Sequence, residues 1–412
     1  MSDDTSMRPS CKGRGYGWSR RDIVSRVLVA VIMTANMAPR SEAAEWSFAP
    51  SIGAKGVYNS NLLLTPLPHN ETYGYWVTPA TEFSGKTERL DVSSRIAADV
   101  VGYFGGEDRQ FTNVFAPLSV RYKTEKDLIG FTGGFTRDNT LLSELQETGV
   151  VLQFAQRNQW TLNPTWTRKL TEKLALQSSA QLSDTTYETA RLVDHRLMGG
   201  SGGLQYQLSE RDHIQLLGSY TDFRTTGSLF GFQANYPGIN MSLTHAFSES
   251  LTGTINGGPK FLSSTSQVPL GAITAHETVW LAGASMTKNW EKATVHVSFA
   301  RDLAPSGFGL LIQTNRGEVA GSYELSETLT ASLNVAGILT SGKNSATIGG
   351  VFPDSSYVSL TPKLSWKVLE WWQAEVSYMY RWRDVDTAAD SAESHATTFM
   401  VTYYPPKLSF SH

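Results

Sequence analysis

Residues 372–383 read Trp-Gln-Ala-Glu-Val-Ser-Tyr-Met-Tyr-Arg-Trp-Arg, and every second position carries an apolar or aromatic side chain. The positions between them carry Gln, Glu, Ser, Met and two Arg. A period of two places alternate side chains on opposite faces of an extended strand. One face is therefore apolar with aromatic residues at both ends, and the other is polar and charged. This pattern predicts a strand that faces lipid on one side and water on the other.

The same alternation occurs elsewhere in the chain. In 329–339 the apolar face is Leu, Ala, Leu, Val, Gly and Leu, and the opposite face is polar apart from Ala336 and Ile338. Residues 90–100 repeat the split, with Asp91, Arg95 and Asp99 on the polar face. Such segments run for about 9 to 14 residues, which matches a tilted membrane-crossing strand, whereas strands average about 5 or 6 residues in soluble proteins.

A short polar turn returns between these segments. Its clearest copies place Ser or Thr and then Glu directly after an apolar residue, and looser copies bring the total to eight. They are 84–88, 123–126, 169–174, 207–212, 246–251, 289–292, 324–329 and 367–370. Their glutamates (Glu88, Glu125, Glu172, Glu210, Glu249, Glu291, Glu327 and Glu370) recur every 36 to 47 residues. That interval suits two strands, one tight turn and one longer loop, and the period of two excludes a helical solenoid.

The other connections are longer and rich in Gly, Pro and Asn. Examples are 59–71, 105–109, 225–236, 304–315, 341–355 and 384–394. Short turns at one end and long loops at the other are typical of outer-membrane barrels, whose long loops face the outside. Eight turns and nine loops predict about eighteen strands, with both termini on the periplasmic side. Sixteen strands remain an alternative because 149–170 is longer than one crossing requires, and this segment is expected to project beyond the membrane.

Composition agrees with this fold class. The 412 residues include 35 Gly, 11 Trp, 16 Tyr and 18 Phe, only 18% are charged, and mean hydropathy is -0.24. A helical membrane protein needs apolar stretches of about 20 residues, and the chain beyond residue 44 has none. The sequence predicts an all-β protein, a transmembrane antiparallel up-and-down β-barrel. The last strand is expected to end near Phe410, although Pro405 and Pro406 cannot donate ladder hydrogen bonds.

The N-terminus resembles a secretion signal. Basic Arg20, Arg21 and Arg26 precede an apolar run at 27–38, and small residues follow at 41–44. We expect residues 1–44 to be a cleaved signal peptide and 45–412 to be the barrel, located in the outer membrane of a Gram-negative cell envelope. A membrane anchor is the alternative, but the apolar run is about half the length that a bilayer requires.

Charge and cysteine content exclude other classes. The single Cys11 lies in the expected signal peptide, so thiolate ligands and disulfides are excluded from the barrel. Without the 7 basic and 4 acidic residues of 1–44, the chain keeps 28 basic and 34 acidic residues, a net charge of -6. A mildly acidic chain is a poor nucleic-acid binder.

Several stretches resemble the β-barrel porin family that accompanies exopolysaccharide and PEP-CTERM sorting systems. They are 58–65 (Tyr-Asn-Ser-Asn-Leu-Leu-Leu-Thr), 134–141 (Gly-Phe-Thr-Arg-Asp-Asn-Thr-Leu) with 147–149, 162–167 (Leu-Asn-Pro-Thr-Trp-Thr), and the Leu-Ser-Glu turns. The resemblance covers nearly all of 45–412. It implies an outer-membrane role in the passage or assembly of an extracellular polymer, with a polysaccharide as the expected class. It brings no catalytic or binding residues with it.

The sequence predicts no arrangement of residues typical of an enzyme active site. The eight histidines form no HxH or HExxH arrangement. His245 and Ser248 are the only lipase-like pair, and they adjoin an expected periplasmic turn. Gly199, Gly200, Gly202 and Gly203 suit a curved strand better than a phosphate cradle, because no helical pattern follows them. We therefore expect no enzyme activity, no cofactor and no metal site.

Five charged residues are candidates for the lumen. The alternation places them on the polar face of their strands, and they are Arg95, Asp99, Glu375, Arg381 and Arg383. An Arg that faced lipid near the midplane would instead lower the stability of the barrel by about 2 to 4 kcal/mol. They either set selectivity for ions or sugars, or pair across strands, and the mixed signs favour pairing over a strongly charge-selective pore. The tryptophans and tyrosines of 371–382 suit an interfacial girdle better than sugar stacking.

The expected function is passage or export of a polysaccharide or another hydrophilic solute, because about eighteen strands can enclose an aqueous lumen. The alternative is a closed barrel that serves as a scaffold or surface attachment for envelope polymers. Expected partners are outer-membrane lipid, the solute and periplasmic export components.

Overall fold

The computed structural model describes residues 45–411, apart from positions 68, 107, 150–152, 227–230, 269–270, 342–353, 387 and 389. The expected signal peptide at 1–44 and most of the expected loop at 341–355 lie outside the described residues. No helix among the described residues is long and apolar enough to span a bilayer.

Strands make up almost the whole described chain. In order they are β1 (Glu45–Asn59), β2 (Thr72–Lys86), β3 (Leu90–Phe104), β4 (Arg109–Lys123), β5 (Asp127–Asn139), β6 (Gln156–Lys169), β7 (Leu174–Tyr187), β8 (Asp194–Gln207), β9 (Asp212–Thr226), β10 (Phe232–Asn235), β11 (Gly238–Ser248), β12 (Leu251–Val268), β13 (Gly271–Asn289), β14 (Ala293–Pro305), β15 (Leu311–Glu324), β16 (Leu329–Ser341), β17 (Ser355–Leu369), β18 (Trp372–Val385), β19 (Ala392–Tyr403) and β20 (Leu408–Ser411). One short helix, α2 (Glu144–Thr148), lies between β5 and β6.

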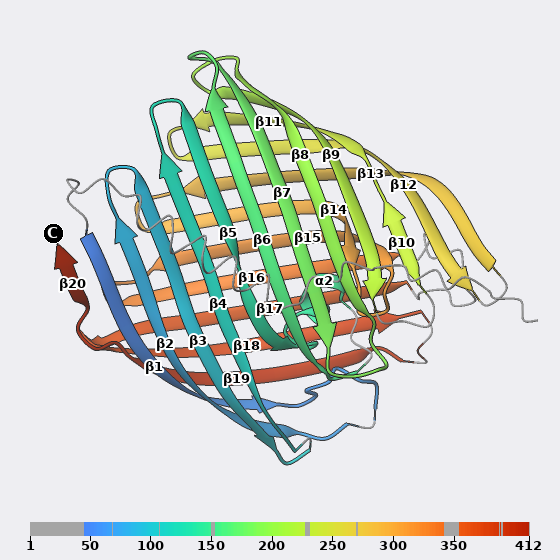
Figure 1. Ribbon diagram of the computed structural model, residues 1–412. Coiled ribbons are helices and arrows are strands. Elements are labelled where there is room, and N and C mark those ends of the chain that lie inside the picture. Colours follow the sequence, from blue (N-terminus) through green and yellow to red (C-terminus); the bar gives the residue numbers. More distant parts are fainter. Residues whose placement is uncertain are drawn as a thin grey trace, which may run out of the picture. The chain divides into compact units, whose positions relative to one another are not determined.

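Neighbouring strands of the wall pair antiparallel, and β1 pairs with β19 to close the sheet into a barrel (Figure 1). β10 and β11 both lie between β9 and β12, so they form one wall strand interrupted near Pro237. β20 continues β19 along β1 after the interruption at Pro405 and Pro406. The wall therefore has 18 strands, and the predicted fold class is confirmed.

The predicted order of turns and loops is also found, with differences at three places. Short turns at one end alternate with longer connections at the other. The expected loop at 225–236 contains strand β10, and β14 and β15 extend into the expected loop at 304–315. Residues 149–170 do not form an over-long strand that projects from the membrane. Within this segment, 156–169 is strand, and the described residues 140–149 of the preceding connection fold into the barrel.

The outer surface carries the apolar band that the alternation predicts. Large apolar side chains are exposed on strand after strand, among them Leu216, Ile239, Ile255, Val297 and Leu333. Exposed aromatic residues gather toward the short turns (Tyr206, Trp290, Tyr323, Trp366, Trp372) and toward the loops (Tyr73, Phe104, Trp160, Tyr220, Trp280). A closed barrel with an apolar band between two aromatic girdles is the architecture of outer-membrane proteins, and it places this chain in the outer membrane.

Buried apolar clusters lie at the loop end and inside the barrel rather than between sheets. One contains Leu62, Val101, Tyr103 and Leu141, and another contains Leu64, Leu145, Ile338, Tyr357 and Ala392. Both combine strand residues with residues of the connections 60–71 and 140–155. The contact between these two connections and the inner wall is therefore one part of the core. A further cluster of Phe223, Phe232, Ala234, Tyr236, Leu262 and Leu311 contains neither connection.

Candidate functional site

The described residues 140–149 and 153–155 between β5 and β6, here called the second inward loop, are organised by the first residues of this loop. The Asn139 side-chain oxygen accepts the backbone N–H of Leu141 at 3.1 Å, and the Ser143 hydroxyl donates to the Asn139 carbonyl at 3.0 Å. Such local bonds favour a turn over continued strand. One turn of helix, α2, follows and ends at Gly149, whose φ of 74° suits glycine.

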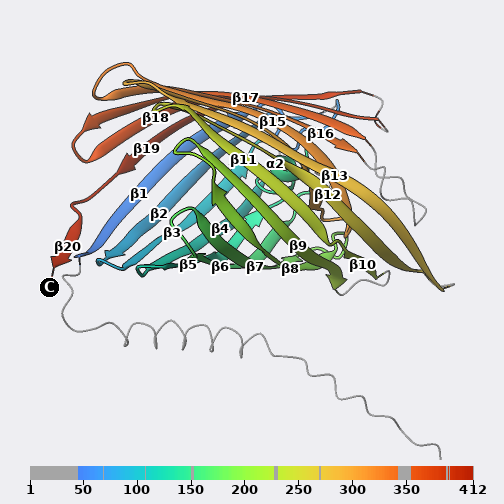
Figure 2. The same cartoon turned by 90° about the horizontal axis from the view of Figure 1, so that it is seen from above.

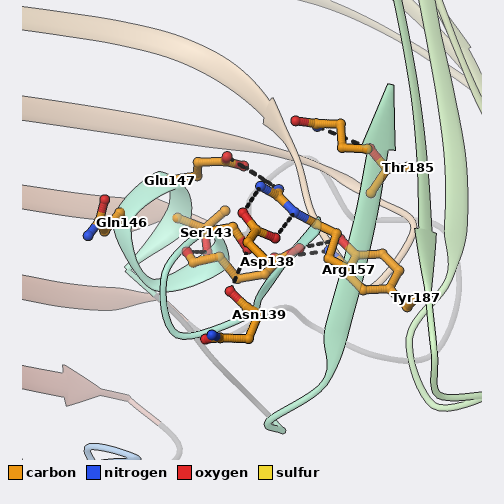
Figure 3. A network of polar contacts seen from close by, with 12 residues as sticks. Asp138, Asn139, Ser143, Gln146, Glu147, Arg157, Thr185 and Tyr187 are labelled. Atoms are coloured by element: carbon orange, nitrogen blue, oxygen red, sulfur yellow. Dashed lines mark hydrogen bonds and ion pairs between the residues drawn. The ribbon is translucent and has the colours of Figure 1, made fainter. Parts of the chain in front are cut away.

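A buried ion-pair network fixes the start of this loop (Figure 3). The Arg157 guanidinium on β6 bonds both oxygens of Asp138 on β5, at 3.0 and 2.9 Å, and reaches Glu147 of α2 at 3.3 Å. The Arg157 and Asp138 side chains are only 5% and 7% exposed. A buried guanidinium needs such compensation, because an unpaired charge there is strongly destabilising.

Glu144 connects α2 to two other parts of the barrel. Its carboxyl oxygens accept a hydrogen bond from the Tyr187 hydroxyl on β7 and one from the Gly307 backbone N–H, the latter at 3.1 Å. Burial raises the pKa of the Glu144 carboxyl, while these hydrogen bonds and Arg157 act in the opposite direction. The carboxyl is thus a buried titratable group at the centre of the loop.

The second inward loop reaches the opposite wall. Arg316 on β15 donates to the Gln146 carbonyl at 3.0 Å, and the Thr340 hydroxyl on β16 donates to the Thr148 carbonyl at 2.5 Å. A Cβ added at Gly149 would lie 3.0 Å from Tyr357 on β17. A loop that leaves β5, returns to β6 and contacts β15 to β17 crosses the lumen, as the position of α2 in Figure 1 shows.

The described residues 60–67 and 69–71 between β1 and β2, here called the first inward loop, meet the second inward loop there. The Asn61 side-chain amide donates to the Thr65 carbonyl at 2.7 Å and to the Glu393 carbonyl at 3.0 Å. Leu64 has a φ of 52°, a strained value for a residue with a Cβ, and it packs into the cluster that contains Leu145 of α2. The two loops together narrow the lumen near its loop end.

The five charged residues singled out from the sequence do not form one site. Arg381 and Arg383 are buried beneath the first inward loop, where Arg381 donates to the Asn61 and Leu62 carbonyls and Arg383 donates to the Leu64 carbonyl at 2.6 Å. They hold the loop and line little open lumen.

The other three pair along the wall. Arg95 lies 3.4 Å from Glu82, and Asp99 accepts the Thr78 hydroxyl at 2.7 Å. Glu375 lies 3.6 Å from Lys363 and accepts the Ser365 hydroxyl at 3.0 Å.

Sequence reasoning missed a wide part of the inner wall in which uncharged amides and hydroxyls predominate among the described residues. Ionisable side chains lie at its borders: Lys260 donates to the Ser219 hydroxyl, and His213 is the register partner of Thr244. The strand registers and the two-residue alternation show which side chains lie on the same inner face as Arg157. We call the following set the neutral wall: Thr161, Asn163, Gln177, Ser179, Gln181, Ser201, Gln205, Gln215, Ser219, Asn240, Ser242, Thr244, Thr254 and Asn256. The only signal in the sequence was the lack of charge at these alternate positions.

Side-chain hydrogen bonds connect the neutral wall across strands. The Gln177 amide donates to Gln205 at 2.6 Å and accepts from Gln215. The Ser179 and Ser201 hydroxyls lie 2.8 Å apart. Amides and hydroxyls offer both donors and acceptors, as do water and the hydroxyl groups of a sugar.

A hollow of about 680 Å³ adjoins this wall toward the short turns. Its lining includes hydroxyl-bearing Ser47, Ser84, Ser93, Ser119, Thr132 and Thr161 together with the Glu82–Arg95 pair. This part of the inner wall is therefore lined mainly by uncharged polar groups, and Glu82, Arg95 and Lys407 are the ionisable side chains among its lining residues.

The lipase-like pair is not assembled. His245 places Nδ1 2.7 Å from Asp212 and stacks edge-on against Phe247, whereas the Ser248 hydroxyl bonds Ser250 at 3.3 Å. Gly199, Gly200, Gly202 and Gly203 lie within strand β8. A Cβ at Gly203 would clash with the Leu216 carbonyl oxygen on β9, so glycine is required for close approach there, whereas Gly200 and Gly202 leave room for an ordinary contact.

No family model and no curated protein matches the chain. Among solved structures, the outer membrane channel DcaP of Acinetobacter baumannii is 11% identical with a TM-score of 0.47, over 88% of this chain and 97% of that one. OccAB3 of the same organism is 10% identical with a TM-score of 0.41, over 88% and 99%. OccK2 (OpdF) of Pseudomonas aeruginosa in complex with glucuronate is 10% identical with a TM-score of 0.42, over 88% and 98%. These likenesses are distant, so the fold and the proposals below rest on this chain's own strands and side chains.

Proposed function

We propose that the protein is a passive outer-membrane channel for hydrophilic solutes, with uncharged oligo- or polysaccharides as the preferred class. The observation that carries the proposal is the neutral wall, because an amide and hydroxyl surface binds sugar hydroxyls without favouring ions of either sign. An 18-strand barrel is wide enough for an aqueous lumen. The resemblance to the exopolysaccharide-associated porin family supports the same solute class, and periplasmic export components are the partners this role needs.

A closed scaffold barrel is the second candidate. It is favoured by one observation, namely that the second inward loop is anchored at both walls, through Arg157 on β6 and through Arg316 and Thr340 on β15 and β16. A loop fixed at both ends is the simplest way to close a barrel of this width.

Single-channel conductance separates the two functions. The protein purified from outer membranes is inserted into a planar bilayer after heat-modifiable gel mobility confirms that the barrel is folded. The proposal expects discrete conductance steps that added neutral oligosaccharides block in a concentration-dependent way. A folded barrel that stays silent at every voltage favours the scaffold, and conductance that no saccharide affects rejects the solute class.

A further inference from the structure

The longest strands of the barrel are β12 and β13, with 18 and 19 residues, and they form a hairpin that extends beyond its neighbours at the loop end (Figure 2). Beside β13, the next strand is shorter. β14 has 13 residues, and its pairing with β13 runs only from Asn289↔Thr294 to Ala282↔Arg301. Beyond that point β14 pairs with β15 alone.

The upper part of β13, from Gly271 to Leu281, therefore has a strand on one side only. It pairs with β12 throughout, from Val268↔Gly271 to Gly258↔Leu281. Within the described part of the chain no ladder is found on its other side. This free edge directly continues the β13–β14 ladder. Its backbone is therefore already extended and can form ladder hydrogen bonds with a further strand.

The register shows which backbone groups the edge offers. Asn289 donates its N–H to Ser250 on the β12 side, and Trp290 donates to Ala293 on the β14 side. Backbone hydrogen-bonding groups alternate between the two edges of a strand. The N–H and C=O groups of the odd positions of β13 therefore point toward β12, and those of the even positions point toward the open side. The open edge thus presents the N–H and C=O groups of Ala272, Thr274, His276, Thr278 and Trp280.

Most features that normally protect an edge strand are missing here, and the inward-pointing charge of Glu277 is the exception among the described residues of the edge. Natural edges carry Lys, Pro, bulges or inward-pointing charges, or are kept very short. The stretch Gly-Ala-Ile-Thr-Ala-His-Glu-Thr-Val-Trp-Leu contains no Pro or Lys and one charged residue, Glu277. The β12–β13 register is continuous along it, without a bulge.

A second copy of this chain does not fit the edge. Two barrels in one membrane are related by an axis along the membrane normal, and barrel strands are tilted by about 35 to 45°. Two equivalent tilted edges then cross at a steep angle and cannot lie antiparallel. An extended peptide is free to take the required direction.

We propose that the open edge of β13, from Ala272 to Trp280, is an extracellular docking site that accepts an extended polypeptide as an added strand. The bound peptide lies antiparallel or parallel to β13 and takes the place that β14 vacates beyond Ala282. Because the edge is nearly uncharged, the peptide is apolar or neutral at the positions that flank Thr274 and Thr278. This site is independent of solute passage.

The test uses the full-length protein in nanodiscs and a fluorescent peptide that copies 261–268 of β12, the segment that already pairs with this part of β13. The double variant Thr274→Pro, Thr278→Pro removes two edge N–H groups without touching the β12 ladder. The matched control Thr274→Val, Thr278→Val changes the same side chains and keeps both N–H groups.

Saturable binding to the unchanged protein and to the Val pair, weakened at least tenfold in the Pro pair, supports the docking site. Heat-modifiable mobility of both variants confirms that the barrel still folds. Absence of binding, or equal binding by the Pro pair, overturns the proposal. A Thr274→Cys variant that forms a disulfide-linked dimer in intact membranes also overturns it, because the occupant is then a second copy.

Discussion

Leu64 of the first inward loop packs in one cluster with Leu145 of α2, and the two side chains are 0% and 1% exposed. This contact joins loops that lie about eighty residues apart in the sequence and that leave the wall at different strands. Removing a fully buried Leu side chain costs about 2 to 5 kcal/mol. Leu145→Ala is expected to loosen both loops and to raise single-channel conductance.

The barrel itself should survive this change, because the cluster lies at the loops and not in the strand ladders. Heat-modifiable gel mobility is expected to remain that of the unchanged protein. Leu216→Ala, on the lipid face, serves as a control of equal chemistry and should leave conductance unchanged. Equal conductance of all three proteins would show that the loop contact does not limit passage.

The Arg157 network gives a second prediction. Arg157→Ala leaves Asp138 buried without its partner, and breaking one side of a buried pair costs about 3 to 5 kcal/mol. The second inward loop should detach, and conductance should rise with less well-defined steps. Arg196→Ala is the control, because Arg196 pairs with Asp184 in a half-exposed position on the outer face. An exposed pair contributes about 0 to 1 kcal/mol, so no change is expected there.

Glu144 makes the loop sensitive to pH. Burial raises the pKa of its carboxyl above the ordinary value of about 4.3. A group whose folded pKa is raised gives its full stability contribution below the ordinary pKa and loses it as pH rises through the raised pKa. The loop is therefore held most firmly in acid, and conductance should increase as pH rises above the ordinary carboxyl range.

Glu144→Gln carries no charge and should show low, pH-independent conductance over the same range. Tyr187, Glu147 and Arg157 face this carboxyl, and Glu147→Gln is the control for the more exposed acid of the same helix. A pH profile that persists unchanged in Glu144→Gln would assign the effect to another group.

The barrel was predictable because each strand carries its own alternation of apolar, lipid-facing residues and polar, lumen-facing residues. Residues 372–383 showed the alternation, and the number of Leu-Ser-Glu turns predicted the number of hairpins. Both patterns are contained within short segments of the sequence. The inward loops were not predicted, because the contacts that fold the second inward loop into the lumen come from Arg316, Thr340 and Gly307, far away in the sequence.

One local signal for the loops was present. Ile338 interrupts the polar face of its strand, and in the structure it lies beneath α2 in the cluster with Leu145. An apolar residue on a lumen-facing position therefore indicates that something covers the wall there. For Arg381 and Arg383 the alternation predicted the face of the strand, but it could not predict the loop carbonyls that they bind.

The neutral wall predicts that its glutamine side chains contribute to the affinity for neutral oligosaccharides. Each lost hydrogen bond between protein and sugar costs about 0.5 to 1.5 kcal/mol. Gln177→Ala combined with Gln205→Ala should weaken neutral oligosaccharide block by about fivefold to a hundredfold and leave the open conductance nearly the same. Gln177→Glu should add cation preference. Asn158→Ala, on the outer face of β6, is the control, and block that is identical in every variant would place solute binding elsewhere in the lumen.

Adjacent positions of one strand test which face meets lipid. Leu216 of β9 is half exposed in the apolar band, and Gln215 beside it bonds Gln177 across the inner wall. An Arg on the lipid face near the midplane costs about 2 to 4 kcal/mol, whereas the lumen hydrates a charge. Leu216→Arg should lower folding yield and the free energy of unfolding by that amount, and Gln215→Arg should fold normally and shift ion selectivity toward anions. If both variants fold equally well, the lipid and lumen faces of β9 are assigned the wrong way round or the band lies at another height along the strand.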